Sequence, residues 1–129
     1  MDGGTLMGWL LVVEHNRLYR EGLETLLEWR TGLSSIYAGS LAEAKGVLEE
    51  ATQKPACTIV DLDLPGGGGP ELLEDLDGVP VLALVEDRSL QRQSEAMGLG
   101  AEEVLLTGSV ETIAATVERL IGPRSTTVF

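Results

Sequence analysis

The 129-residue chain is short of cysteine and of long apolar runs. Its one cysteine, Cys57, cannot form an internal disulfide, which is consistent with a reducing compartment. Because Cys57 opens an apolar run, we interpret it as a buried structural thiol rather than a nucleophile. No apolar stretch approaches the ~20 residues of a membrane-spanning helix, and the N-terminal MDGGTLMG lacks the basic start of a signal peptide. We therefore expect a soluble, cytoplasmic protein.

Basic residues are also scarce, since 9 Lys and Arg stand against 21 Asp and Glu, for a formal net charge of −12. A nucleic-acid-binding protein neutralises phosphates with Lys and Arg, so this composition argues against direct nucleic-acid binding by the chain. It argues equally against an anionic membrane surface as a partner. With 43% hydrophobic residues, the chain can bury the core of a single domain.

Five short apolar segments predict strands, over residues 9–13, 34–37, 56–60, 79–85 and 103–106. The first, third and fourth are continuously apolar, as is typical of parallel strands covered on both faces. Between them, apolar residues recur at helical spacing and predict helices over residues 18–27, 41–51, 70–76, 90–97 and 110–120. Strand and helix thus alternate five times, which predicts an α/β protein with a parallel sheet between two helix layers.

Individual residues predict local features of packing, helix ends and turns. The apolar stripe of the first helix consists of Leu18, Gly22, Leu23, Leu26 and Leu27. Ser40-x-x-Glu43 is a capping-box pattern, Gly98 is expected to close the fourth helix, and Gly122-Pro123 to stop the fifth. We expect Trp9 and Trp29 to pack in the core or against helices. Gly66–Gly69 is interpreted as a flexible turn, because no Lys follows it as in a phosphate-binding loop.

In doubly wound sheets, ligands bind beyond the carboxyl ends of the strands, at a topological switch point. The residues at those ends are Glu14-His15, Asp61, Val85-Glu86-Asp87 and Thr107. We therefore expect the functional site among them. The domain is expected to span residues 9–122, preceded by an extension over 1–8 and followed by a tail or the start of a linker over 123–129.

Four stretches carry a family resemblance: LLVVEHNRLYREGLETLLE, CTIVDLDLPGGGGPELLEDL, VPVLALV and GLGAEEVLLTG. Together, over about residues 9–121, they resemble the receiver domain of bacterial response regulators. The most specific piece is Asp61-x-x-x-Pro65-Gly66 after a buried strand. The resemblance implies a flavodoxin/CheY-like (βα)5 fold with strand order 2-1-3-4-5. LYREGLETLL further resembles the subfamily whose receivers precede a LuxR-type helix-turn-helix domain, which implies transcription regulation and a homodimer.

The resemblance also assigns roles at the strand ends. Asp61 stands where the family accepts a phosphoryl group from a sensor histidine kinase. Glu14 and His15 stand where two acidic residues help to hold Mg²⁺, and the backbone carbonyl of Asp63 would complete those protein ligands. The chain itself is then a signalling domain rather than an enzyme.

Three positions depart from the family pattern. His15 replaces a carboxylate, Val85 replaces the Ser or Thr that closes onto the phosphoryl group, and Thr107 replaces the Lys that pairs with it. Imidazole suits Mg²⁺ poorly, and a phosphoryl group on Asp61 would lack a fixed cation. We therefore expect a degenerate receiver in which Mg²⁺ binding is weak and phosphorylation is weak or absent.

Several alternatives stay open. One is a phosphorylation-independent protein-interaction module on the same fold. His15 could act as a pH sensor beside Asp61, or join Glu14 and Asp61 in a transition-metal site. Asp63, Glu86 and Asp87 could simply be solvated loop acids. An enzyme or flavin binder is poorly supported, because no base–nucleophile pair or phosphate-binding loop is visible.

Overall fold

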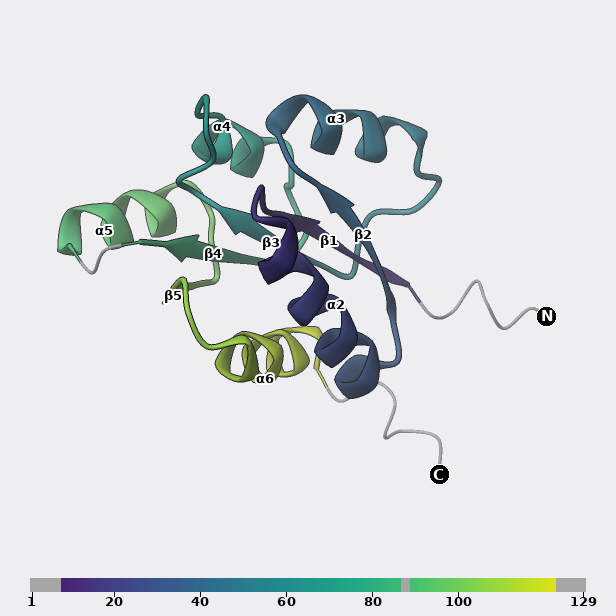
Figure 1. Cartoon of the computed structure of the whole chain (residues 1–129). Helices are drawn as coiled ribbons and strands as arrows, with labels where there is room; N and C mark the ends of the chain where they lie inside the picture. Colours follow the sequence, from purple (N-terminus) through teal and green to yellow (C-terminus); the bar gives the residue numbers. More distant parts are fainter. Residues whose placement is uncertain (1–7, 87–88, 123–129) are drawn as a thin grey trace.

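A computed structural model describes residues 8–86 and 89–122 of the chain. Its five strands form one parallel sheet in the order β2-β1-β3-β4-β5 (Figure 1). The strands are β1 (Trp9–Val13), β2 (Ser34–Ala38), β3 (Cys57–Asp61), β4 (Val81–Val85) and β5 (Glu103–Leu106). The helices are α2 (Arg17–Thr31), α3 (Leu41–Glu50), α4 (Gly69–Glu74), α5 (Leu90–Gly98) and α6 (Val110–Ile121). The predicted doubly wound α/β fold, with strand order 2-1-3-4-5, is confirmed.

The helices cover the sheet in two layers. α2 and α6 lie on one face, and α3, α4 and α5 lie on the other (Figure 1). Successive side chains of a strand point to opposite faces, so β1 sends Leu11 and Val13 into one core and Leu10 and Val12 into the other. Every residue of β3 and β4 is buried, which explains why these strands are apolar except for Thr58 and the strand-end Asp61.

Four strand bounds differ from the prediction. β2 ends at Ala38 rather than at residue 37, and β3 begins at Cys57 rather than at residue 56. β3 ends at Asp61 rather than at residue 60, so the acidic side chain is the last of the strand. β4 begins at Val81 rather than at residue 79, because Pro80 has no N–H to donate to a neighbouring strand. The carbonyl of Pro80 still accepts a hydrogen bond from the N–H of Thr58 (3.0 Å).

The predicted packing of α2 is wrong at three residues, Leu18, Gly22 and Trp29, all of which are exposed. Leu23 and Leu27 are fully buried, but Leu18 is 80% exposed and Trp29 is 78% exposed. At about 100° per residue, Leu18 lies about 140° from Leu23 around the helix, and Trp29 about 200° from Leu27. Both side chains therefore point away from the sheet. Trp9, in contrast, packs against the core as expected, and its indole N–H donates to the carbonyl of Gln53 (3.1 Å).

The start of α3 follows the capping-box prediction in part. The Ser40 hydroxyl accepts a hydrogen bond from the N–H of Glu43 (3.2 Å). The carboxylate of Glu43 accepts from the N–H of Gly39 (2.6 Å), one residue further back than the pattern implies.

Two helix ends were predicted from glycine. α6 ends at Ile121 and is capped by Gly122, as predicted. Gly98, in contrast, is the last residue of α5, and the left-handed backbone falls on Gly100 (φ +110°), two residues later. Pro123, the predicted tail and residues 1–7 of the predicted extension lie outside the described residues. Among the described helices, none has the length and apolar character that a membrane span requires.

The glycine run before α4 is a turn, as predicted. Gly66, Gly67 and Gly68 all have positive φ angles (84°, 82° and 99°), a conformation that side chains other than glycine rarely adopt. Glycine is required at residue 69 for a different reason, because the space is too small for a side chain. A Cβ there would lie 2.8 Å from the Cα of Leu62 and 2.9 Å from the carbonyl oxygen of Asp61. α4 therefore begins directly against the strand end that carries Asp61.

Candidate functional site

Glu14 and Asp61 stand at the carboxyl edge of the sheet, where the paired strands β1 and β3 end. Both are buried, at 2% and 3% exposure. Each carboxylate accepts a hydrogen bond from a backbone N–H two residues further on, Glu14 from Asn16 (3.0 Å) and Asp61 from Asp63 (2.8 Å). The second oxygen of Glu14, Oε1, is buried without a hydrogen-bond partner. Two buried carboxylates thus lie at the same edge of the sheet.

Burial raises the pKa of Glu14 above its ordinary value of 4.5. The hydrogen bond from the N–H of Asn16 lowers the pKa, the negative charge of Asp61 and a side-chain hydrogen bond with Asp61 raise it, and His15 lowers it by a smaller amount. The protonated form of Glu14 is therefore favoured relative to a free glutamate.

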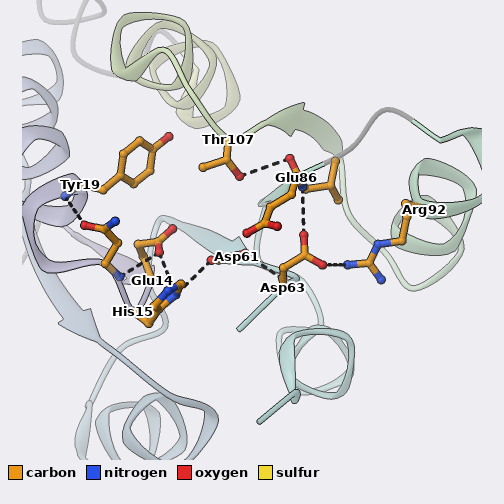
Figure 2. Close-up of polar contacts among 10 residues, drawn as sticks. Glu14, His15, Tyr19, Asp61, Asp63, Glu86, Arg92 and Thr107 are labelled. Carbon is orange, nitrogen blue, oxygen red and sulfur yellow. Dashed lines mark hydrogen bonds and ion pairs between the residues drawn. The ribbon is translucent and has the colours of Figure 1, made fainter. Parts of the chain in front are cut away.

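His15 bridges the two carboxylates. Its Nδ1 lies 3.3 Å from Oε2 of Glu14 and 3.6 Å from Oδ2 of Asp61 (Figure 2). The His15 side chain is 42% exposed, so this group of residues reaches solvent at the imidazole. One ligand atom from each of the three residues lies within 4.8 Å of the others, and in the part of the chain that the structure describes they form the one such cluster of three.

Hydrogen bonds anchor the start of α2, directly after His15. Asn16 is the N-cap, and its side-chain oxygen accepts a hydrogen bond from the N–H of Tyr19 (3.1 Å). The Tyr19 hydroxyl in turn accepts from the N–H of Gly108, after β5 (3.2 Å). Burial raises the pKa of Tyr19. The sequence offered no signal for this link between α2 and the β5–α6 loop, because it depends on the distance between two segments far apart in the chain.

Asp63 is not a solvated loop acid, contrary to one of the expectations. It forms an ion pair with the guanidinium of Arg92 on α5, and its other carboxylate oxygen accepts from the N–H of Glu86 (2.9 Å). Arg92 also pairs with Glu95 (3.1 Å). The Asp63 side chain is 28% exposed. Asp63 therefore ties the loop after β3 to the loop after β4 and to α5 (Figure 2).

The sequence predicts no fixed cation at Asp61. Arg92 brings a guanidinium to the loops after β3 and β4, where Asp63 and Glu95 bind it. For Asp61, the ion-pair partner among the described residues is His15. Of the other acids in this region, Glu86 is exposed, and Asp87 lies outside the described residues. Sequence reasoning missed Arg92, whose visible feature was an i,i+3 spacing to Glu95 that suits any exposed helix.

Val85 ends β4 and Thr107 directly follows β5, on the other side of Asp61 from Glu14. Val85 is buried at 1% exposure. The Thr107 hydroxyl donates to the carbonyl of Val85 (3.2 Å), and the Thr107 N–H donates to the same oxygen (2.9 Å). The hydroxyl of Thr107 is thus used within the β4–β5 edge rather than offered to Asp61.

The donor set does not match the Mg²⁺ site that the resemblance implies. Mg²⁺ prefers oxygen ligands in near-octahedral geometry, whereas the cluster contains two carboxylates and one imidazole. His15 occupies the position where a second carboxylate would add an oxygen and a negative charge. The expectation of weak Mg²⁺ binding is consistent with this donor set.

Known proteins share both sequence and fold with the chain. A family model for the response regulator receiver domain matches residues 10–115. The KDP operon transcriptional regulatory protein KdpE of Escherichia coli (strain K12) is 36% identical over 99 residues, 74% of this chain and 43% of that protein. The chain therefore spans less than half the length of this relative.

Solved structures match over most of the chain. The chemotaxis protein CheY4 of Vibrio cholerae superposes with a TM-score of 0.78 at 22% identity, covering 88% of this chain and 98% of that one. A Burkholderia pseudomallei response regulator protein with a phosphorylated aspartic acid, calcium ion and citrate has a TM-score of 0.75 at 24% identity. That match covers 93% of this chain and 72% of the other. At these identities the likeness concerns the fold.

Proposed function

This chain belongs to the family of response regulator receiver domains, and we propose that it is an atypical receiver whose Asp61 is phosphorylated weakly or not at all. The surroundings of Asp61 carry the proposal. Among the described residues its ion-pair partner is a half-exposed imidazole, and the nearby Thr107 hydroxyl is bound to Val85.

Charge is the main physical reason. A phosphoryl group on Asp61 would bring close to two negative charges next to the buried carboxyl of Glu14. A charge-assisted hydrogen bond from a Lys would contribute about 1.5–3 kcal/mol, and one lost transition-state donor typically costs about 10²–10³ in rate. Thr107 supplies no charge. Phosphoryl transfer to Asp61 should therefore be slow, and the product poorly stabilised.

Transmission of a phosphorylation signal should be weak as well. Val85 has no hydroxyl that could hydrogen-bond a phosphoryl oxygen on Asp61, so phosphorylation would not pull the end of β4 toward Asp61. The neighbouring backbone at Glu86 is already hydrogen-bonded to Asp63, which also holds Arg92 on α5. We propose that these contacts keep the β4–α5 region in one conformation whether or not Asp61 is modified.

The receiver family and the relative KdpE support a proposal for the regulator to which this domain belongs. We propose that the domain belongs to a two-component response regulator that controls transcription through a separate DNA-binding domain and pairs with a second copy. A transcriptional regulatory protein, KdpE, is 36% identical to the chain over 99 residues. A histidine kinase would be the partner if Asp61 accepts phosphoryl groups at all.

A second candidate is a phosphorylation-independent interaction module on the same fold. The Asp63–Arg92 ion pair favours this alternative, because it fixes α5 without any phosphoryl group. Under this reading the chain binds its partner constitutively, and Asp61 is a structural remnant.

Intact mass spectrometry separates these possibilities. The untagged protein is incubated with Mg²⁺ and acetyl phosphate or phosphoramidate, and the mass is followed over time. Asp61→Asn is the negative control, and Asp77→Asn, an exposed aspartate before β4, is the matched control. We expect little or no gain of one phosphoryl mass. Rapid, stoichiometric phosphorylation that depends on Asp61 would overturn the proposal of a degenerate receiver.

A further inference from the structure

We propose that Glu14, His15 and Asp61 form a three-ligand site for a borderline transition-metal ion of the Zn²⁺ or Co²⁺ class, in place of a Mg²⁺ site. The inference rests on the proposed function in one respect: weak or absent Mg²⁺-dependent chemistry at Asp61 leaves the cluster available to another metal ion. It is carried by the donor chemistry, the spacing of the ligands and an unpartnered oxygen.

The donor chemistry comes first. One imidazole nitrogen and two carboxylate oxygens resemble the His and Glu sets of open zinc sites more closely than the oxygen sets of Mg²⁺. Imidazole suits Zn²⁺, Ni²⁺ and Cu²⁺. Two ionised carboxylates would balance the charge of a divalent ion. His15 is the one histidine of the chain, and it lies at this cluster.

The spacing agrees with a tetrahedral site. With metal–ligand bonds of about 2.0–2.2 Å, two ligands of a tetrahedral ion lie about 3.3–3.6 Å apart. Adjacent ligands of an octahedral Mg²⁺ site lie about 2.8–3.0 Å apart. Nδ1 of His15 lies 3.3 Å from Oε2 of Glu14 and 3.6 Å from Oδ2 of Asp61. Both separations fall in the tetrahedral range.

The unpartnered oxygen gives an independent reason. Glu14 is 2% exposed, yet its Oε1 has no hydrogen-bond partner. A buried carboxylate oxygen without a partner loses its hydration without compensation. A metal ion between Glu14 and Asp61 would satisfy the carboxylate, because either oxygen of Glu14 can coordinate it. Figure 2 shows the Glu14 carboxyl group beside Asp61 and above the His15 ring.

The surroundings leave the cluster accessible. Arg92 is bound to Asp63 and Glu95, so this guanidinium does not already neutralise Glu14 or Asp61. The 42% exposure of His15 leaves the solvent side open, and a fourth position would be available to water or to a ligand from outside. We infer an open site rather than a closed structural one.

Metal titration of the untagged full chain tests the inference. Zn²⁺ and, separately, Mg²⁺ are titrated by isothermal calorimetry, and Co²⁺ is added as a probe whose visible absorption reports tetrahedral coordination. We expect one equivalent of Zn²⁺ to bind far more tightly than Mg²⁺. His15→Ala should weaken Zn²⁺ binding by more than about tenfold, since losing even a hydrogen-bond partner behind a metal ligand costs about 10–100-fold.

Two further variants keep the test decisive. Cys57→Ala removes the chain's one thiol, which is buried at the start of β3, and should leave Zn²⁺ binding unchanged. His15→Asp should reverse the preference by weakening Zn²⁺ and strengthening Mg²⁺ binding. Circular dichroism of each variant checks that it folds.

The outcomes also distinguish this inference from the proposed function. Zn²⁺ binding that survives His15→Ala, or no Zn²⁺ binding at all, overturns the metal site, while the phosphorylation assay is unaffected. Tight His15-dependent Zn²⁺ binding together with rapid Mg²⁺-dependent phosphorylation of Asp61 would support the site and overturn the degenerate receiver.

Discussion

Arg92 of α5 forms an ion pair with Asp63, two residues beyond the strand-end Asp61, and both side chains are 28% exposed. Asp63 also accepts a hydrogen bond from the N–H of Glu86. This arrangement joins two loops at the carboxyl edge of the sheet to one helix. A contact of this kind, partly shielded from water, should be stronger than the exposed ion pairs elsewhere on the surface.

Arg92→Ala should therefore lower the free energy of unfolding by about 1–2 kcal/mol. Urea denaturation measures the change, and hydrogen exchange should show reduced protection of the Glu86 N–H. Arg17→Ala is the matched control, because Arg17 pairs with Glu21 at 81% and 56% exposure. That variant should change stability by less than about 0.5 kcal/mol. Equal effects of the two variants would show that the Asp63 contact is no stronger than a surface ion pair.

Gly69 should be intolerant of a side chain. Its Cβ would meet the backbone of Leu62 and Asp61 at 2.8 and 2.9 Å, and backbone cannot move aside as a flexible side chain can. We expect Gly69→Ala to cost about 1–3 kcal/mol, as overpacking of a core does. Thermal or urea unfolding measures the loss.

Gly46→Ala is the matched control for this prediction. Gly46 lies in the middle of α3, and a Cβ there would meet nothing within 4 Å. Because alanine restricts the unfolded chain and favours the helix, we expect a gain of about 0.5–1 kcal/mol. A stabilising Gly69→Ala would show that α4 can move away from the end of β3.

The fold was predictable because apolar residues recur along the sequence in the patterns of buried strands and of helices. Continuous apolar strands and helical stripes determined the order of elements, and the family resemblance supplied the strand order. Leu18 and Trp29 show the limit of such patterns. Apolar residues near a stripe were assigned to it, yet the helical rotation places both side chains in solvent.

The candidate site was predictable only where the chain itself brings residues together. Glu14 and Asp61 could be placed near each other, because both follow paired parallel strands. The role of Arg92 could not be predicted, because its guanidinium reaches Asp63 from another element 29 residues away. A contact between two exposed-looking charges leaves no trace in hydrophobic periodicity.

Glu14 should make stability depend on pH. Burial raises its folded-state pKa above the ordinary value of 4.5, so the folded state binds the proton more tightly than the unfolded state. This contribution is present below pH 4.5 and is lost as the pH rises through the folded-state pKa. Glu14→Gln should therefore be more stable than the wild type at pH 7, and the difference should shrink in acid.

Urea denaturation of both proteins between pH 4 and pH 8, in the presence of a chelator, measures this difference. Glu28→Gln, at an exposed position of α2, is the control for the loss of one carboxylate. If Glu14→Gln is less stable than the wild type at pH 7, then the ionised carboxylate contributes a favourable contact that outweighs its burial.

Restoring the missing groups should restore phosphorylation. Thr107 is exposed directly after β5, so a Lys fits there, although it gives up the hydrogen bond from the hydroxyl to Val85. His15→Asp returns the missing carboxylate. The control is His15→Asp with Thr52→Lys, which adds the same charge at an exposed position after α3. One recovered transition-state donor is worth about 10²–10³ in rate. The double variant His15→Asp/Thr107→Lys should thus gain a phosphoryl group from acetyl phosphate about 10²-fold faster than this control. Equal rates would mean that the cation is not what phosphoryl transfer to Asp61 lacks, and the loss would have to be traced to the position of Val85.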